Sequence, residues 1–418
     1  MSSAALPSER ALYKDHRFVL PFSCETARLF KPVQLAGKQI HRVGLAPLTR
    51  MRASAGAQVP RNPMVAEYYT QRASEGGFLV TEATFIAHEA GGYPLAPGIY
   101  SQEQIDAWKE VTSAVHAKGS TIALQLWALG RANNDPFGAG KYVKTVAPSP
   151  VPINEGEPLP EELSIDDIKR YIGHYRQAAR NAMEAGFDLV EIHGANGYLI
   201  DQFTQYNSNK RTDAYGGPIE NRTRFALEVI EAVVAEVGQE KVGFRISPWG
   251  TFQGMQEADP LKTFSYLVQK IVDTYPKFGY VHMTEGVEWH PGAFDTKNLA
   301  EGVIPGNDPL RAIVRGIEPS SIKNDHSTVF PEPTPERPTL VISASGFKPD
   351  NVYNHVERTG DVICFGRLFI ANPDLPYRLK NHVELNAYDR NTFYTQDAAG
   401  YTDYPFANEE SKSGKAHL

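Results

Sequence analysis

The sequence predicts an α/β protein, a (β/α)8 TIM barrel that forms a single domain. Short runs rich in apolar and β-branched residues alternate along the chain with longer amphipathic segments, which is the pattern of β-α-β units around a parallel sheet. Several of these runs are apolar almost throughout, as strands buried on both faces should be. The eight strand candidates are Val43–Ala46, Phe78–Phe85, Thr121–Trp127, Leu189–His193, Val242–Ser247, Tyr280–Glu285, Thr339–Ala344 and Val362–Gly366.

Two further observations favour a closed barrel over an open, doubly wound sheet. No Gly-x-Gly-x-x-Gly motif follows the first strand candidate, so the usual start of a dinucleotide-binding fold is missing. Polar residues instead recur at the C-terminal ends of successive strand candidates, where barrel enzymes keep their chemistry. These residues are Thr49, Glu82, Gln125, His193, Asn196, Arg245, Glu285 and Ser345.

The segments between the strands carry helix signals at their ends. Ser164 precedes two acidic residues, which is typical of a helix N-cap followed by a negatively charged first turn. Apolar residues then recur at helical spacing until Gly186, where this helix should end. Pro218 is expected to open a further helix that runs to Gly238.

The chain divides into three parts by composition. We expect residues 1–27 to form an N-terminal arm, residues 28–405 the barrel and residues 406–418 a C-terminal tail. Residues 286–338, between the sixth and seventh strand candidates, are rich in proline, glycine and charge. A long connection at this place in a barrel is usually a lid or binding loop rather than a second domain, so a lid-like loop is expected there.

Composition excludes several classes of partner. The 418 residues carry a net charge of −7, and no basic stretch suggests a nucleic acid partner. No run approaches the roughly 20 apolar residues that a membrane span needs. The cysteines, Cys24 and Cys364, are too few for a disulfide framework and fit a reducing compartment. We therefore expect a cytoplasmic protein, with a peroxisomal location as the alternative because Ala416-His417-Leu418 resembles a peroxisomal address.

The run from Glu191 to Tyr198 places an imidazole, a carboxamide and a phenol within a few residues at the end of the fourth strand candidate. His193 and Asn196 can both donate hydrogen bonds to one oxygen and so polarise a carbonyl group. The phenol of Tyr198 can deliver a proton beside them. The alternative is that His193 and Asn196 merely satisfy the loop backbone. Their position together at a barrel strand end favours the catalytic interpretation.

Two glycine turns end the last two strand candidates. Barrel enzymes often hold a phosphate at this place on loop amides, where glycine lets the backbone approach closely. An arginine there can bind the phosphate with two hydrogen bonds. Ser345 and Gly346 form the first turn, and Phe365, Gly366 and Arg367 the second. The alternative is a pair of ordinary turns with a surface arginine.

Arg245 is a charged residue in an otherwise apolar strand candidate. A buried arginine needs an anionic or strongly polar partner. A reduced flavin can supply one, because its pyrimidine edge becomes negative. A structural ion pair with a glutamate of a neighbouring strand is equally compatible with the sequence.

Longer motifs follow one another in order along residues 28–405. They include Leu29-Phe30-Lys31-Pro32, Ala46-Pro47-Leu48-Thr49-Arg50-Met51-Arg52, Gln125-Leu126-Trp127, His193-Gly194-Ala195-Asn196-Gly197-Tyr198-Leu199, Ile219-Glu220-Asn221-Arg222, Phe365-Gly366-Arg367-Leu368-Phe369 and Tyr401-Thr402-Asp403-Tyr404-Pro405. In these motifs the chain resembles the Old Yellow Enzyme family of FMN-dependent ene-reductases, in its fungal type. It departs from the yeast-type members in its longer arm, in Ser345-Gly346 where they have Gly-Asn, and in the long segment 286–338, which cannot be aligned.

The resemblance implies a tightly bound, non-covalent FMN as cofactor and NADPH as hydride donor. Thr49 would tune the reactive edge of the flavin, Gln125 would read its pyrimidine edge, and Arg245 would lie beside its N1 and C2 oxygen. The full set of residues implied to bind the cofactor is Pro47, Leu48, Thr49, Ala83, Gln125, Arg245, Ser345, Gly346, Phe365, Gly366 and Arg367.

The resemblance also implies a reaction, in which hydride passes from NADPH through FMN to the β-carbon of an α,β-unsaturated aldehyde or ketone. His193 and Asn196 would hold the substrate carbonyl oxygen, and Tyr198 would protonate the α-carbon. Aromatic residues would line the substrate pocket, namely Trp127, Phe393 and Tyr394. The expected partners are small molecules, with a homodimer left open, and no metal is expected.

Three alternatives remain at this level. A relative in secondary metabolism could reduce or isomerise one specific unsaturated aldehyde, although retention of Tyr198 favours reduction. A flavin-free lyase or aldolase would need a Schiff-base lysine or a metal cluster at the strand ends, and the sequence suggests neither. A flavin-binding protein without turnover should have lost the set of His193, Asn196 and Tyr198, which is complete here.

Overall fold

The computed structural model describes residues 27–134, 143–287 and 293–407. Within these ranges eight parallel strands pair in chain order and close on themselves, since β13 pairs with β3 and β4 pairs with β6. The barrel predicted from the alternation of strands and helices is therefore confirmed. Its strands are β3 (Val43–Leu45), β4 (Phe78–Val80), β6 (Thr121–Trp127), β9 (Leu189–His193), β10 (Val242–Ile246), β11 (Tyr280–Thr284), β12 (Leu340–Ala344) and β13 (Val362–Phe365).

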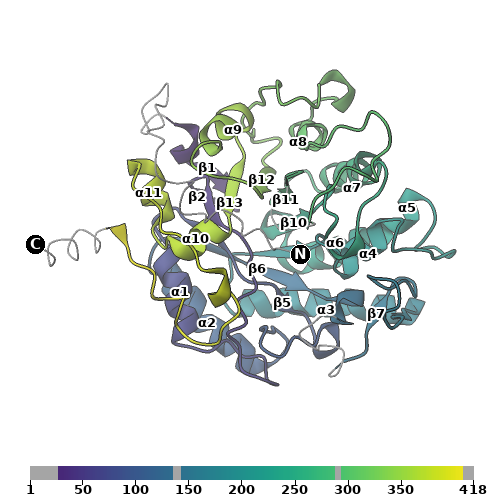
Figure 1. Ribbon diagram of the computed structural model, residues 1–418, viewed down its shortest axis with the longest axis horizontal. Coiled ribbons are helices and arrows are strands. Elements are labelled where there is room, and N and C mark those ends of the chain that lie inside the picture. Colours follow the sequence, from purple (N-terminus) through teal and green to yellow (C-terminus); the bar gives the residue numbers. More distant parts are fainter. Residues whose placement is uncertain (1–26, 135–142, 288–292, 408–418) are drawn as a thin grey trace, which may run out of the picture.

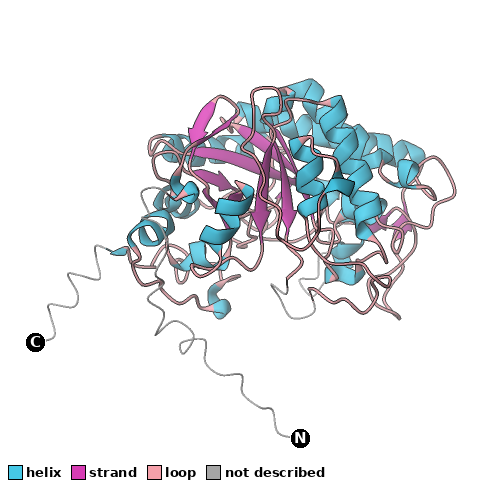
Figure 2. Ribbon diagram, turned by 90° about the horizontal axis from the view of Figure 1, so that it is seen from above, coloured by secondary structure: helices cyan, strands magenta, loops and turns pink. Residues whose placement is uncertain are grey.

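Helices surround the strands, and Figure 1 shows them following the chain around the barrel. Figure 2 shows the strands enclosed by this helical layer. The helices are α1 (Met64–Arg72), α2 (Gln102–His116), α3 (Ile165–Glu184), α4 (Leu199–Thr204), α5 (Ile219–Arg222), α6 (Arg224–Val237), α7 (Pro260–Thr274), α8 (Asp308–Arg315), α9 (Val352–Thr359), α10 (Arg367–Ala371) and α11 (Leu375–Asn381).

Shorter strands and 3-10 turns complete the described structure. The extra strands are β1 (Val33–Leu35), β2 (Lys38–Ile40), β5 (Thr84–Phe85), β7 (Val146–Ala147) and β8 (Glu161–Glu162). The 3-10 turns are η2 (Arg28–Phe30), η3 (His88–Ala90), η4 (Gly130–Asn134), η6 (Gln239–Lys241), η7 (Phe252–Gly254), η8 (Pro319–Ser321) and η9 (Arg390–Thr392).

The antiparallel hairpin of β1 and β2 plugs one end of the barrel. Val33, Leu35 and Ile40 of this hairpin are buried in one cluster with the first residues of several barrel strands, such as Phe78 and Leu189. Since the strands are parallel, this filled end is their N-terminal end. The C-terminal ends of the strands therefore form the mouth, where barrel enzymes place their catalytic residues.

Alternate residues of each strand point into the barrel or toward the helices, because side chains in a strand alternate between its two faces. On β9, Leu189 belongs to the interior cluster, whereas Val190 and Ile192 pack with helical residues in the outer one. The same parity on the neighbouring strands turns a set of polar side chains inward. This set is Gln125, Glu191, His193, Arg245 and His282.

The strand predicted over Phe78–Phe85 is wrong in its continuity, because it is split into β4 and β5. Beyond β4 the N–H of Thr81 still donates to the carbonyl of Ala123 at 2.9 Å, but the next backbone groups bond to side chains. The N–H of Glu82 donates to the hydroxyl of Tyr69 at 2.9 Å, and the N–H of Gln125 donates to the hydroxyl of Thr81 at 3.1 Å. These contacts come from distant parts of the chain, so the local pattern could not reveal the break.

The helix signals are confirmed at α3 and corrected after Pro218. Ser164 and Asp167 form a capping box at the start of α3, and Gly186, with φ +85°, follows its end. The helix expected from Pro218 to Gly238 consists of two pieces, α5 and α6, with Thr223 between them. The hydroxyl of Thr223 donates to the carbonyl of Ile219 at 2.8 Å, a contact that commonly bends helices.

The lid-like loop predicted over residues 286–338 is wrong in its extent, because α8 lies inside it. Pro309 stands at the start of α8, and Leu310, Ile313 and Val314 are buried at helical spacing. This signal covers only eight residues between segments rich in proline and charge, too short to stand out from the sequence. The predicted arm, apart from Ala27, and the peroxisome-like tripeptide Ala416-His417-Leu418 lie outside the described residues.

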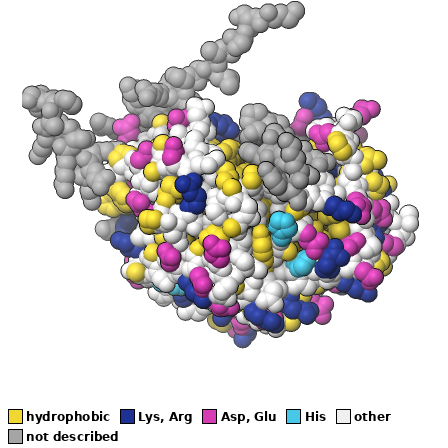
Figure 3. All heavy atoms as spheres, turned by 90° about the horizontal axis from the view of Figure 1, so that it is seen from below, with side chains coloured by type: hydrophobic (Ala, Val, Ile, Leu, Met, Phe, Trp, Pro, Cys, Tyr) yellow, Lys and Arg dark blue, Asp and Glu magenta, His cyan; other side chains and the backbone are white. Residues whose placement is uncertain are grey.

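On the face in Figure 3, basic and acidic side chains are interspersed rather than gathered by sign. Among the described residues, no helix combines the length and the apolarity that crossing a membrane requires.

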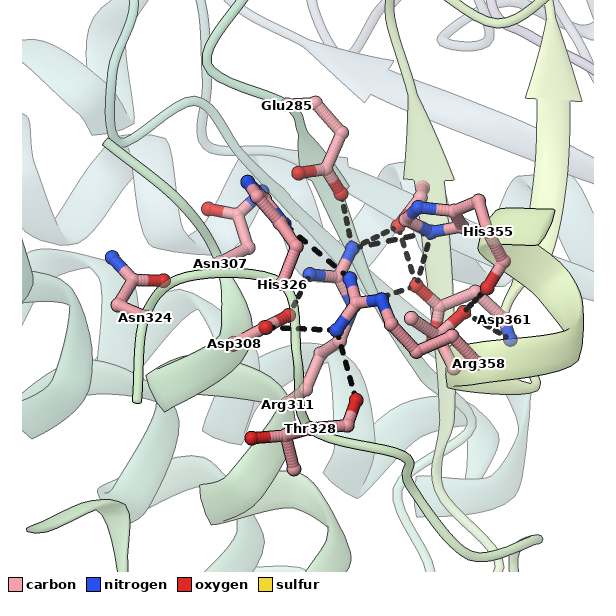
Figure 4. Close-up of polar contacts among 12 residues, drawn as sticks. Glu285, Asn307, Asp308, Arg311, Asn324, His326, Thr328, His355, Arg358 and Asp361 are labelled. Carbon is pink, nitrogen blue, oxygen red and sulfur yellow. Dashed lines mark hydrogen bonds and ion pairs between the residues drawn. The ribbon is translucent and has the colours of Figure 1, made fainter. Parts of the chain in front are cut away.

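A buried ion-pair network fixes α8 against the outer side of the barrel (Figure 4). The guanidinium of Arg311 contacts Asp361 at 2.8 Å and Asp308 at 3.0 Å, and it also pairs with Glu285. Burial by itself raises the pKa of Asp361, but Arg311 and His355 together bring it well below its ordinary value. The side-chain oxygen and nitrogen atoms of Glu285, His355 and Asp361 that could bind a metal ion lie within 4.8 Å of one another. Arg311, however, already pairs with both carboxylates.

Loss of the Arg311 charge should destabilise the protein strongly. Arg311→Met leaves buried carboxylates without their partner, which typically costs about 3–5 kcal/mol. Urea unfolding of the native and variant chains measures this difference. As a control, Lys109→Met removes a cation that pairs with Asp106 and Glu184 on the exposed surface and should leave the unfolding midpoint nearly unchanged. Equal midpoints for native and Arg311→Met chains would contradict the structural importance of the network.

Candidate active site at the barrel mouth

The predicted site residues come together at the mouth because they belong to the C-terminal halves or ends of parallel strands in one closed barrel. Pro47, Leu48 and Thr49 follow β3, and Ala83 lies between β4 and β5. The remaining positions are spread over the other strands. Gln125 and Trp127 lie on β6, His193 on β9, Arg245 on β10, Ser345 and Gly346 after β12, and Phe365, Gly366 and Arg367 at the end of β13.

The turn that carries Asn196 is held from three sides. Asn196 has a left-handed backbone with φ +57°, and its N–H donates to the hydroxyl of Ser247 at 2.7 Å. Its carbonyl accepts from the amide of Gln253 at 2.8 Å. Gly197 follows with φ +76°, and a Cβ there would lie 2.8 Å from the Cβ of Gln253, so only glycine fits. The buried Asp201 carboxylate accepts the Gly197 N–H at 2.8 Å.

His193 is buried as a neutral imidazole with a defined tautomer. Burial, together with the nearby Arg245 and His282, brings the pKa of His193 well below its ordinary value. The N–H of Ala195 donates to Nδ1 of His193 at 3.3 Å, so Nδ1 is an acceptor. The ring proton of the neutral form therefore lies on Nε2. This arrangement makes Nε2–H a hydrogen-bond donor to a ligand at any pH near neutrality.

Tyr198 lies beside His193, as the sequence interpretation requires. The two ring centroids are 4.9 Å apart, with an interplanar angle of 74°. Trp127 packs edge-on against Tyr198 at 5.0 Å and stacks on Phe85 at 4.7 Å. Trp127 is completely buried, and its ring supports the Tyr198 ring.

Arg245 carries a buried hydrogen-bond donor without a partner inside the barrel. Its side chain is buried, yet its Nε has no hydrogen-bond partner among the described residues. Burial lowers the pKa of Arg245, and the Glu191 carboxylate partly opposes this effect. The ion pairs formed by the described residues join Glu191 to His282 and not to Arg245. A buried donor without a partner costs free energy, so this position fits a ligand that supplies an acceptor, as the pyrimidine edge of a flavin does.

The two glycine turns that are predicted to bind a phosphate also show features of a binding site. Ser345 has φ +81° and Gly346 φ +74°, and a left-handed non-glycine residue stores strain that is often found at functional sites. A Cβ at Gly366 would lie 3.2 Å from Leu48, which brings two of the predicted contacts together. Arg367 is only partly buried, and its guanidinium contacts the hydroxyl of Tyr388 at 3.3 Å.

The C-terminal segment reaches the mouth through two arginines that follow Thr49. Arg50 donates to the carbonyl of Phe393 at 3.1 Å, and Arg52 donates to the same carbonyl at 3.0 Å. Phe393 is partly buried, whereas Tyr394 is 53% exposed. Phe393 is therefore tied to the segment that follows Thr49 through its carbonyl group, and its ring centroid lies 5.9 Å from the Arg50 guanidinium.

Two polar residues at strand ends do not join the site. Glu285 belongs to the Arg311 network on the outer side of the barrel. The Glu82 carboxylate accepts the N–H of Arg50 at 3.1 Å, and burial raises its pKa to about 7. The rule that polar residues at strand ends serve the site is therefore wrong for both.

Three residues near the site were missed by the sequence analysis. Tyr388 lies between Arg367 and Phe393, with a centroid distance of 5.7 Å to the Phe393 ring. Glu191 and His282 lie on the interior face of their strands. The signal that singled out Arg245, a polar side chain in an apolar strand, applies equally to Glu191 and His282.

The Asp201 carboxyl should make stability depend on pH. Burial, with a further contribution from Glu257, raises the pKa of Asp201 to about 7 in the folded chain, above the value of about 4 for unfolded aspartate. The folded state thus retains a proton that the unfolded state loses, and stability falls as the pH rises from about 4 to 7.

Asp201→Asn should remove this contribution. The stability of the native chain relative to the variant is expected to decrease with rising pH by at most about 1.4 kcal/mol per pH unit in that window. Urea unfolding at several pH values between about 4 and 8, a range that spans about one unit beyond the folded pKa, provides the measurement. The exposed Asp106→Asn serves as control and should keep the native profile. Parallel profiles for native and Asp201→Asn chains would refute the expectation.

Comparison with known proteins agrees with this geometry. Residues 28–302 match the NADH:flavin oxidoreductase / NADH oxidase family. The chain is 43% identical to a flavin oxidoreductase of Emericella nidulans over 402 residues, which cover 91% of this chain and 97% of that protein.

Two further relatives come from a plant and from another fungus. The chain is 44% identical to 12-oxophytodienoate reductase 1 of Oryza sativa subsp. japonica, over 88% of this chain and 90% of that protein. It is also 44% identical to a chanoclavine-I aldehyde reductase of Penicillium roqueforti, over 93% of this chain and 99% of that protein. The chain belongs to this flavin oxidoreductase family, the Old Yellow Enzyme family, and is an FMN-dependent oxidoreductase.

Proposed function

We propose that this protein uses NADPH to reduce the C=C bond of α,β-unsaturated aldehydes and ketones. The proposal is carried by one observation: His193, with its proton on Nε2, lies in ring contact with Tyr198 and on the same turn as Asn196 at the barrel mouth. This combination of two donors for a carbonyl oxygen and one proton source is what the reduction of an activated C=C bond requires.

The chain's own residues would hold FMN across the mouth. Arg245 and Gln125 would contact its pyrimidine edge, Ser345, Gly346, Gly366 and Arg367 its phosphate, and Pro47, Leu48, Thr49 and Ala83 its ring. The chemistry supplied by bound FMN is hydride transfer, from NADPH to the β-carbon of the substrate. Placement of the reactants and exclusion of water are then the work of the protein.

His193 and Asn196 would donate hydrogen bonds to the substrate carbonyl oxygen and draw charge away from the C=C bond. Donors of this kind are worth about 3 kcal/mol each in other enzymes. Because His193 is held neutral by burial, it would act as a donor without transferring its proton. Tyr198 would protonate the α-carbon.

The names of the relatives support a substrate that carries a carbonyl group. They include a 12-oxophytodienoate reductase and a chanoclavine-I aldehyde reductase. The second of these favours, as an alternative, a reductase that acts on one specific aldehyde in secondary metabolism. Retention of Tyr198 as proton donor supports reduction rather than isomerisation in that case as well.

The proton-donor role of Tyr198 can be tested in the two half-reactions. The purified native chain should be yellow and should oxidise NADPH faster when cyclohexenone is present. Tyr198→Phe should slow reoxidation by cyclohexenone by about 100-fold or more, the usual worth of a general acid, while reduction by NADPH is nearly unchanged. Stopped-flow absorbance of the flavin separates the two steps. The exposed Tyr377→Phe is the control, and equal slowing of both steps would contradict the assignment.

The carbonyl-binding role of His193 and Asn196 can be tested without turnover. A phenolate carries its negative oxygen where the proposed donors would hold a carbonyl oxygen. The double variant His193→Ala, Asn196→Ala should therefore lose the long-wavelength absorbance band that phenols produce with bound flavin. His116→Ala, at an exposed position on α2, should keep it. Retention of the band in the double variant would overturn the assignment of these two residues.

A further inference from the structure

Glu191 is a completely buried carboxylate inside the barrel that the proposed reaction does not use. Its Oε1 accepts a hydrogen bond from Nε2 of Gln125 at 2.7 Å. Its Oε2 contacts Nδ1 of His282 at 2.7 Å. Both partners come from other strands, Gln125 from the adjacent β6 and His282 from β11. A buried carboxylate with this set of neighbours is an organised part of the interior rather than an accident of packing.

The charge of Glu191 is retained despite its burial. Burial by itself raises the pKa of Glu191, but His282, Arg245 and Gln125 together bring it below its ordinary value. An ionised carboxylate only accepts hydrogen bonds. The two groups that hydrogen-bond to its oxygens must therefore present donors, which means that Nδ1 of His282 carries a proton and that Gln125 turns its NH2 group toward Glu191.

This constraint determines which end of the Gln125 amide is available elsewhere. The two ends of a carboxamide differ, since the nitrogen only donates and the oxygen only accepts. With the nitrogen held by Glu191, the remaining group is Oε1. No described residue donates a hydrogen bond to this oxygen. The structure thus offers an acceptor at Gln125 and an unpartnered donor at Arg245, on the two strands that flank β9.

The pyrimidine edge of a flavin has the complementary pattern. Its N3–H is a donor, and its N1 and C2 oxygen are acceptors. We propose that Glu191 is a positioning residue for the cofactor, which holds Gln125 in the orientation that accepts from the flavin N3–H while Arg245 donates to the neighbouring acceptors. This inference rests on the proposed function, because it takes FMN to lie at the barrel mouth.

Replacement of Glu191 by glutamine removes the carboxylate, which can only accept hydrogen bonds, with little change in side-chain volume. The amide that Glu191→Gln introduces has one oxygen for two donors, the Gln125 amide and Nδ1–H of His282. If the new oxygen accepts from His282, the new NH2 group donates to a Gln125 amide that has turned over. If the new oxygen accepts from Gln125, His282 moves its proton to Nε2 and the original orientation remains. The Gln125 amide is therefore no longer held in a single orientation. The Glu191→Gln variant should therefore bind FMN and an FMN that is blocked at N3 with similar affinity.

The test compares two probes, FMN and N3-methyl-FMN, which lacks the N3–H donor. The native full-length chain should bind FMN at least about 10-fold more tightly, the equivalent of about 1.4 kcal/mol for one buried hydrogen bond. Glu191→Gln should reduce this ratio to near one. Affinities are measured by quenching of flavin fluorescence, a readout that does not depend on turnover. Asp361→Asn, another buried carboxylate but on the outer side of the barrel, should keep the native ratio.

An exchange of the two side chains tests orientation apart from general stability. In the double variant Gln125→Glu, Glu191→Gln, the NH2 group introduced on β9 can donate to the carboxylate introduced on β6. The other oxygen of that carboxylate remains an acceptor for N3–H. This exchange should restore the preference for FMN. It also serves as the test if Glu191→Gln alone fails to fold, because it keeps the charge and the hydrogen bond of the pair.

The outcomes separate this inference from the proposed function. If the native chain binds neither probe, both are overturned. If the native chain prefers FMN and Glu191→Gln keeps that preference, the positioning role alone is overturned. If the folded exchange variant shows no preference, the orientation argument is overturned as well. Loss of preference in Glu191→Gln with recovery in the exchange variant establishes the role of Glu191.

Discussion

The hydrogen bonds between β13 and β3 close the sheet, and this closure governs the rest of the structure. A closed barrel of parallel strands has one interior, and every second residue of every strand must fit inside it. The β1–β2 hairpin and large apolar residues fill the N-terminal end. Polar side chains that share the same parity are thereby forced together near the mouth, although they lie far apart in the sequence.

The electrostatics of this interior follow from burial. His193 is kept neutral, whereas Arg245 and Glu191 keep opposite charges within the buried interior. A charge in such surroundings is costly unless its hydrogen bonds are satisfied. Glu191 meets this condition through Gln125 and His282, but the Nε of Arg245 does not. The hydrogen bonds of Glu191 are thus satisfied within the protein, whereas Arg245 is suited to bind a ligand.

On the outer side of the barrel, buried charges are stabilised in a different way. There Arg311 gathers three carboxylates from β11, α8 and the start of β13 into one network. Each of these carboxylates has Arg311 as a partner within the protein, and the network serves to hold α8 in place. Buried charge thus has two uses in this chain, and the presence or absence of an internal partner is what separates them.

The sequence alone was enough to predict the barrel, the strand centres and the set of His193, Asn196 and Tyr198, because these features depend on local periodicity and on residues close together in the chain. The interruption of the strand after Val80, the helix within residues 286–338 and the separation of Glu285 from the site depended on contacts between distant segments. The same holds for the tautomer of His193 and for the orientation of Gln125 by Glu191. A hydrogen bond between strands is decided only when the barrel closes, since register and inward direction are properties of the assembled sheet and not of any one strand.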